Sequence, residues 1–217
     1  MTSPLEALAF AMGIKPALRL SLSPADAARE AGLWRARGAV VIERGGYVYA
    51  ARDLEHVTAL CDAESEIPPD GPRRTPDETV RSAHRELGRR LGYPPCCVQA
   101  FLERLERGVQ KRPDGTEAAE VVVAAEIAWS SATRRYARLN FLLPRRRALV
   151  PFQPCAFDCE SSLEYAEALH REYQRRESKE AADLEAALKK DVVLGRRGPL
   201  TAGASEPAVL TLRWDGF

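Results

Sequence analysis

The sequence lacks any long hydrophobic run. Of its 217 residues 45% are hydrophobic, yet no apolar stretch approaches the ~20 residues that a helix needs to cross a bilayer. The opening stretch, MTSPLEALAFAMGIKPALRL, carries Glu6 early and has no basic segment before its apolar run, as a secretory signal would require. We therefore expect a cytoplasmic protein in which this stretch is a helix of the mature chain.

An excess of charge of either sign is also missing. The 32 lysine and arginine residues nearly balance the 31 acidic residues, which leaves a formal net charge of +1. This balance gives no general reason for binding nucleic acid or a membrane, so any basic patch must be local. The sequence also contains no phosphate loop and no dinucleotide-binding fingerprint.

Cysteine is scarce, with five residues, an odd number, in the whole chain. A chain of this length can bury enough apolar surface to fold without disulfide staples, and a reducing cytosol keeps thiols from pairing. The five cysteines therefore indicate metal or redox chemistry rather than a disulfide framework.

The pattern that is present predicts an α+β protein. The segment GAVVIERGGYVYAARD predicts a hairpin, with strands over Val40–Glu43 and Tyr47–Ala50 and a turn at residues 44–46. A helix follows from Asp53 as its N-cap to about Glu64. Pro, Gly and charged residues are dense in SEIPPDGPRRTPDE, which predicts a linker.

Helices dominate the rest of the chain. We expect helices from Thr75 or Asp77 to about 90, and over 95–108, 116–138 and 158–190, the last being the longest and solvated in its charged second half. KRPDG is a turn, RRRALVPFQPC is a short strand and loop, and β structure returns at 192–194 and 208–214. The predicted domains are an N-terminal α/β subdomain (1–68), a linker (69–76), a helical core with the cysteine site (77–190) and a β tail that packs back on the core (191–217).

The cysteines gather at two predicted helix starts. In LGYPPCCVQAF the second proline suits the first helical position, because its missing N–H costs nothing there, and Cys96 and Cys97 then lie in the first turn. In PCAFDCESS, Asp158 is a natural N-cap, which puts Cys159 at the first helical position and Cys155 in the preceding loop. Helix N-termini stabilise thiolates. Both pairs are therefore placed where cysteine becomes a metal ligand or a nucleophile.

Four thiolates suit zinc or an iron–sulfur cluster, [4Fe–4S] or [2Fe–2S]. Adjacent cysteines diverge and converge poorly on one ion, whereas a cubane offers separate iron corners. We therefore favour a [4Fe–4S] cluster over zinc, bound by Cys96, Cys97, Cys155 and Cys159. Two other hypotheses stay open: a labile disulfide between Cys96 and Cys97, and burial of all four cysteines as apolar side chains.

Arginines precede both cysteine pairs. If the pairs meet in space, guanidinium groups nearby can offset the thiolate charge or hold an anionic substrate. Because adjacent side chains diverge, we expect only one or two to face the site, although arginines taken singly are more often solvated. The candidates are Arg89, Arg90, Arg145, Arg146 and Arg147.

Three further side chains are of residue types that could bind a metal, but only one of them is expected near the site. His84 lies on the apolar stripe of its helix and faces the start of the next one, where it can serve as a ligand, a proton donor or a buried histidine. Cys61 lies on an apolar helix face and is expected in the core. His170 shares a face with Cys159 but lies eleven residues on, ~16 Å away and too far to share a site.

The paired cysteine motif resembles an uncharacterised prokaryotic family marked by G-Y-P-x-C-C and, much later, P-C-x-x-x-C-x-x-S. The resemblance covers about Asp77 to Tyr165 and rests on LGYPPCCVQAF and NFLLPRRRALVPFQPCAFDCESS. It implies one site made by the four cysteines, with Tyr93, Asn140 and Ser162 around it. Tyr93 joins His84 as a candidate catalytic residue, and Asn140 is a candidate substrate ligand.

The sequence thus predicts a cytoplasmic iron–sulfur protein, an enzyme of redox or sulfur-transfer chemistry on a small or anionic substrate, whose electron donor it does not identify. Two alternatives stay open. One is a structural zinc protein that binds a partner or nucleic acid through its arginines. The other is a metal-free dithiol oxidoreductase that uses Cys96 and Cys97.

Overall fold

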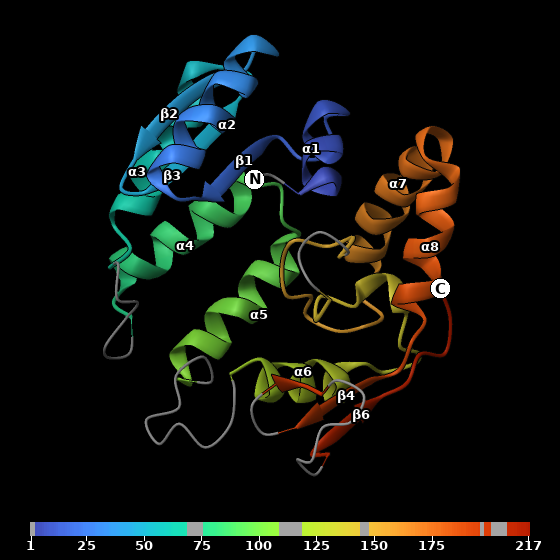
Figure 1. The fold of residues 1–217 in the computed structure, drawn as a ribbon. Coiled ribbons are helices and arrows are strands. Elements are labelled where there is room, and N and C mark those ends of the chain that lie inside the picture. The colour runs from blue at the N-terminus through green and yellow to red at the C-terminus, as the bar shows by residue number, and fades with distance from the viewer. Residues whose placement is uncertain (1–2, 69–75, 109–118, 144–147, 196–197, 201–207) are drawn as a thin grey trace. The chain divides into compact units, whose positions relative to one another are not determined.

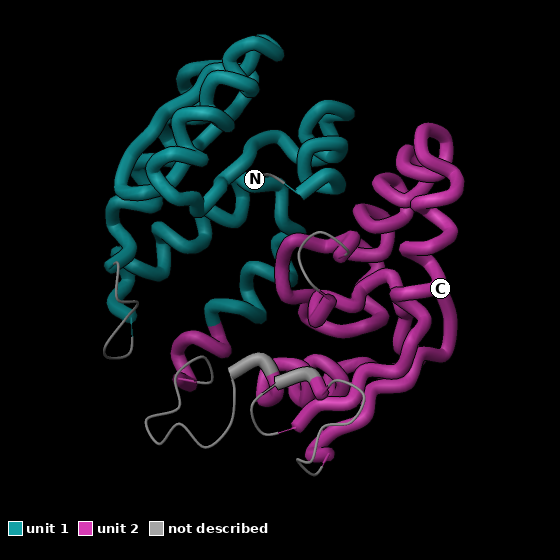
Figure 2. Tube along the Cα trace, viewed as in Figure 1, with its two compact units in different colours: residues 1–102 teal, residues 103–217 magenta. Residues whose placement is uncertain are grey.

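The computed structural model describes residues 3–68, 76–108, 119–143, 148–195, 198–200 and 208–217 (Figure 1). The chain forms two compact units, Met1–Leu102 and Glu103–Phe217 (Figure 2). Each unit combines helices with a small antiparallel sheet, which confirms the predicted α+β class. The predicted linker and the KRPDG turn lie almost entirely outside the described residues.

The sheet of the first unit contains the predicted hairpin. Strands β2 (Val40–Arg44) and β3 (Tyr47–Ala51) are joined by Gly45 and Gly46, whose φ angles are 60° and 81°. Two successive positive φ angles are what a two-residue hairpin turn of the favoured hand requires. Strand β1 (Ala17–Ser21) pairs antiparallel with the other edge of β3, which gives the order β1-β3-β2.

The first twenty residues do not form the single helix that the sequence predicts. Helix α1 spans only Pro4–Ala11; Gly13 follows with a φ of 74°, and the chain then enters β1. Gly13 permits a left-handed turn, and Pro16 cannot donate the hydrogen bond that would continue a helix. The alternation Leu18-Arg19-Leu20 was the strand signal, since both leucines are buried against the core.

Helices cover both faces of this sheet. Residues of α1 and α2 (Pro24–Ala36) pack with Leu18 and Val48 on one face, and residues of α3 (Leu54–Ser65) pack with Tyr49 on the other. Two more helices follow, α4 (Glu78–Arg90) and α5 (Pro95–Glu106).

The starts of α3 and α4 are as predicted. The carboxylate of Asp53 accepts a hydrogen bond from the His56 N–H at 2.7 Å, and that of Asp77 accepts one from the Val80 N–H at 3.0 Å. Each bond satisfies a backbone donor that the first helical turn leaves unpaired. Local sequence therefore fixes these two boundaries.

The second unit contains α6 (Ala119–Ser130), the short 3-10 helix η1 (Ala137–Leu139), α7 (Glu160–Arg176) and α8 (Ser178–Leu188). The tail forms a sheet of order β5-β4-β6, built from β4 (Val192–Gly195), β5 (Gly198–Pro199) and β6 (Leu210–Leu212). The return to β structure at the end of the chain is therefore confirmed. The described part of RRRALVPFQPC, residues 148–155, contains no strand.

Two helices of this unit are shorter than predicted. Helix α6 ends at Ser130 instead of continuing to Arg138, because the Ser131 hydroxyl donates to Ile127 O and accepts from the Phe157 N–H, both at 2.8 Å. The helix predicted over 158–190 breaks at Glu177, where φ is −136°. The break lets α8 pack against α7 and bury Ala181, Leu184 and Leu188, while most of the other side chains of this charged second half are exposed, as predicted.

Among the described residues, none of the helices combines the length and the apolar character needed to cross a membrane.

Candidate metal centre

Four of the five cysteines lie together. The sulfur atoms of Cys96, Cys97, Cys155 and Cys159 all lie within 4.8 Å of one another, so this set can hold a metal ion. Cys61 lies elsewhere, in the core formed by α3 and the first sheet. Both findings agree with the expectation that the two cysteine pairs form one cluster and that Cys61 is a core residue.

The turn before α5 places the first pair. Gly92 has a φ of 76°, and a Cβ there would lie 2.5 Å from Pro16 Cδ, so only glycine fits this close approach. The Cys97 and Val98 N–H groups both donate to Pro94 O, at 2.9 and 3.0 Å. Helix α5 therefore begins at Pro95 as predicted, and the Cys97 N–H takes part in the turn.

The adjacent cysteines do not diverge as the sequence reasoning assumed. The Sγ atoms of Cys96 and Cys97 are 3.9 Å apart. A tetrahedral ion with metal–sulfur bonds of about 2.3 Å separates its sulfurs by about 3.8 Å. The pair is therefore spaced as two ligands of a single ion are.

The second pair precedes α7, and its local geometry differs from the prediction. Cys159, not Asp158, is the N-cap residue, and the helix begins at Glu160. The Asp158 carboxylate instead accepts hydrogen bonds from the N–H and the hydroxyl of Thr133, at 2.8 and 3.0 Å. Burial alone would raise the pKa of Asp158, but these bonds hold it below its usual value. Asp158 thus fastens the loop before Cys159 to residue 133.

Ser162 supports one thiolate directly. Its side chain is completely buried, and its hydroxyl donates to Cys159 Sγ at 3.3 Å. A hydrogen bond to sulfur stabilises the thiolate form that binds metal. The structure therefore places Ser162 where the family resemblance implies it.

The four cysteines differ in exposure. Cys97 and Cys159 are only 2% and 8% exposed, whereas Cys155 is half-buried and Cys96 is exposed. Two of the candidate ligands are therefore held by packing, and Cys96 can be reached from solvent.

One residue near the centre was missed by sequence reasoning. Arg104, on α5, is 3% exposed and donates through Nη2 to Cys155 O at 3.2 Å and to Pro154 O at 3.3 Å. A usable signal exists, since Arg104 follows Cys97 by seven residues, about two helical turns on the same face. Its apolar neighbours Leu102 and Leu105 also marked a buried face.

The arginines singled out in the sequence are placed differently. Arg89 and Arg90 both bind Glu86, at 2.6 and 2.7 Å, and the hydrogen bonds from Arg89 and Arg90 lower the pKa of Glu86 to about 2. Arg145, Arg146 and Arg147 lie outside the described residues. A role for these five residues in anion binding stays a prediction.

The other candidates have well-defined surroundings. The His84 ring packs against Phe101, with centroids 5.3 Å apart, and burial lowers its pKa. The Tyr93 ring faces the Lys15 ammonium group at 5.8 Å. Asn140 is fully buried, and its Oδ1 accepts from the Leu142 N–H at 3.2 Å. His84 is not a member of the cysteine cluster, and catalytic roles for His84 and Tyr93 stay predictions.

The chain matches no protein-family model, no curated protein and no solved structure. The resemblance to the family marked by two cysteine pairs therefore stays a prediction, and the function of the centre has to be argued from its own geometry.

Proposed function

We propose that this protein binds one metal ion in tetrahedral coordination through the thiolates of Cys96, Cys97, Cys155 and Cys159, and that the ion is zinc. The observation that carries the proposal is the spacing of the sulfurs: 3.9 Å for the first pair and at most 4.8 Å for any pair. Zinc bound to four thiolates requires about 3.8 Å. Small side-chain adjustments are enough to reach that value.

A closed shell of four thiolates is typical of zinc sites that stabilise a fold, because catalytic zinc keeps one position open for water or substrate. Metal bound by these residues would join the start of α5 to the start of α7 and the loop before it. The proposed function is therefore that of a metal-stabilised module. A closed centre of this kind favours binding to a partner over catalysis at the metal.

The second candidate is the [4Fe–4S] cluster favoured by the sequence pattern, in an enzyme of redox or sulfur-transfer chemistry. On a cubane each thiolate binds a different iron, and the sulfurs are about 6 Å apart. Cys96 and Cys155 are not buried, so rotation of their side chains can widen their distances toward that spacing. The buried Cys97 and Cys159, within 4.8 Å of each other, would need the surrounding chain to move. The exposure of Cys96 and Cys155 is the observation that keeps the cluster in consideration.

Anaerobic purification followed by metal and acid-labile sulfide analysis separates the two candidates. We expect one zinc per chain, no labile sulfide and a colourless protein. Brown protein with iron and labile sulfide in equal amounts would replace the single ion with a cluster. Protein that contains neither metal, and takes up neither on reconstitution, would remove both candidates and leave dithiol chemistry.

A further inference from the structure

A buried arginine contacts the backbone of one cysteine of the centre. The side chain of Arg104 is 3% exposed, and a charged group is costly to bury unless it is paired and hydrogen-bonded. Its Nη2 donates to Pro154 O and Cys155 O at 3.3 and 3.2 Å. These contacts hold the backbone of Pro154 and Cys155, and therefore the position from which the Cys155 side chain extends.

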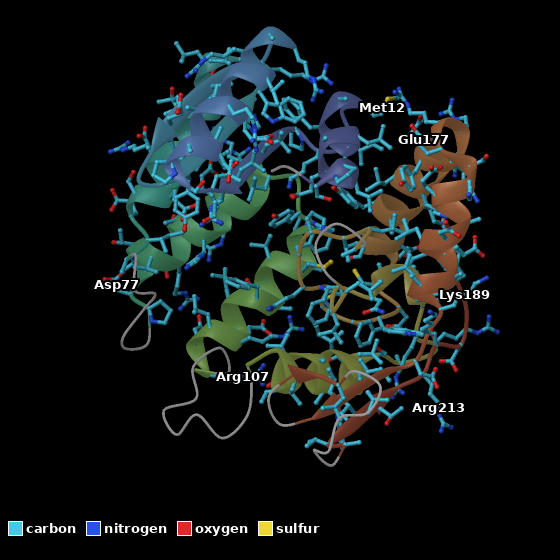
Figure 3. The ribbon with its side chains drawn as sticks, viewed as in Figure 1. Met12, Asp77, Arg107, Glu177, Lys189 and Arg213 are labelled. Carbon is cyan, nitrogen blue, oxygen red and sulfur yellow. The ribbon has the colours of Figure 1, made fainter. Side chains whose placement is uncertain are left out.

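An acidic residue on α6 pairs with a second nitrogen of this guanidinium. Glu126 Oε2 lies 3.6 Å from Arg104 Nε and 2.9 Å from Arg107 Nη2. The planar guanidinium presents its donors in a fixed fork, so Glu126 at Nε and the two carbonyls at Nη2 together fix the orientation of its plane. Arg107, by contrast, is 57% exposed and lies at the C-terminal end of α5 (Figure 3).

Arg104 also belongs to the helix that carries the first cysteine pair. Helix α5 runs from Pro95 to Glu106, and Arg104 follows Cys97 by seven residues, about two turns along the same face. The same rigid element therefore supplies two thiolates and the donor that holds the backbone of a third cysteine.

We propose that Arg104 is a positioning residue of the metal centre: it holds the Cys155 backbone so that the thiolate meets the other three. The inference rests on the proposed function, since it requires that the four cysteines bind metal.

The test compares the full-length variants Arg104→Gln, Arg104→Lys and Arg107→Gln with the parent. Each protein is stripped of metal under reducing conditions and titrated with cobalt(II) against a chelator, and the visible bands of the cobalt–thiolate complex are recorded. Loss of a group that orients a ligand typically weakens metal binding 10- to 100-fold. We expect such a loss in Arg104→Gln with altered cobalt bands, and a smaller loss in Arg104→Lys, which keeps the charge but not the fork.

Arg107→Gln is the matched control, because Arg107 shares Glu126 but has no contact with the carbonyls of Pro154 and Cys155 among the bonds given above. We expect parental affinity and parental bands from it. Parental cobalt affinity and bands in Arg104→Gln, even with a lower melting temperature, would overturn the inference and leave Arg104 as a packing residue.

Two outcomes separate this inference from the proposed function. If the parent itself binds no cobalt, the proposed function fails whatever the arginine variants do. If Arg104→Gln does not fold, Arg104→Lys decides: weakened binding with a native far-UV spectrum supports the positioning role, and unchanged binding with unchanged bands overturns it.

Discussion

At the scale of single residues, the cysteines of the centre have unequal surroundings. Cys97 and Cys159 are buried, and Cys159 also accepts a hydrogen bond from Ser162. Cys96 is exposed. Buried side chains cannot turn away to other partners without loss of packing. Cys97 and Cys159 are therefore the ligands whose replacement is most informative.

Replacement of Cys97 by Ala should abolish stoichiometric metal binding, because three thiolates cannot complete the tetrahedral shell. Cys61→Ala is the control: this cysteine lies in the core around α3 and not in the cluster, so the variant should keep its metal and lose about 1 kcal/mol of stability. Metal content by mass spectrometry and thermal unfolding measure the two effects. Full occupancy in Cys97→Ala would show that the adjacent cysteines are not joint ligands.

Ser162→Ala should weaken metal binding by about tenfold, the lower end of what loss of an outer hydrogen bond to a ligand costs. The hydroxyl is buried and donates to Cys159 Sγ at 3.3 Å. Its neighbour Ser161 is exposed, so Ser161→Ala provides a control of identical chemistry. Chelator competition measures both affinities. Equal affinities in the two variants would mean that the bond to sulfur does not support the centre.

Cys96 should be the first cysteine of the cluster to react with iodoacetamide in the metal-free protein. The reaction needs a thiolate that solvent can reach, and of the four only Cys96 is exposed. Peptide mapping by mass spectrometry after short labelling times gives the order of modification. Bound metal should slow labelling of all four. Modification of Cys97 or Cys159 ahead of Cys96 would contradict the exposures on which this order depends.

At the scale of elements, the start of α5 depends on the turn that precedes it. Gly92 and Gly38 both have positive φ angles, 76° and 82°, but a Cβ at Gly92 would meet Pro16 Cδ at 2.5 Å while one at Gly38 has no atom within 4 Å. Alanine at either position would therefore carry the same cost of a left-handed backbone, about 1–2 kcal/mol. Only at Gly92 would the clash with Pro16 add to that cost.

Gly92→Ala should accordingly destabilise the protein more than Gly38→Ala does, with the difference reporting the contact with Pro16. Denaturant unfolding of the two variants and the parent measures it. Because the turn leads directly into the first cysteine pair, Gly92→Ala should also weaken metal binding, while Gly38→Ala should not. Equal losses of stability would show that the segment around Pro16 yields to the added methyl group.

Elements with a local signal were predictable, and those set by distant contacts were not. Asp53 and Asp77 cap their helices, and the Gly45–Gly46 turn closes its hairpin, as the sequence indicates. Strand β1 was missed because the alternation of Leu18, Arg19 and Leu20 covers only three residues, and because its pairing with β3 joins residues as far apart as Ala17 and Ala51. The early end of α6 likewise depends on the contact of Ser131 with Phe157.

The candidate site shows the same limit. Its cysteines stand out because adjacent and closely spaced cysteines are rare in a chain with only five of them. The signal for Arg104, its place two turns after Cys97, is weak among 32 lysine and arginine residues. Two of the arginines nearest to the cysteines in sequence bind Glu86. Proximity in sequence identified the ligands, but only the fold identifies what surrounds them.

At the scale of the whole molecule, the balanced acidic and basic residues form ion pairs within each unit. Arg44 pairs with Asp62 in the first unit and Arg213 pairs with Asp191 in the second, at 3.4 and 3.8 Å. Exposed pairs of this kind contribute little stability individually. A metal that joins residues from α5 to residues before α7 would be a far stronger constraint, since binding to the folded state alone stabilises it in proportion to the logarithm of ligand excess.

X-ray absorption spectroscopy of the purified protein at the metal edge tests the central claim most directly, because it measures the number, type and distance of the atoms that coordinate the ion. We predict four sulfur neighbours at about 2.3 Å, the distance of zinc–thiolate bonds, and no second metal in the scattering. The same spectrum from Cys97→Ala should lose this shell. A metal–metal vector in the parent, or a first shell of oxygen and nitrogen, would contradict the four-thiolate single-ion centre.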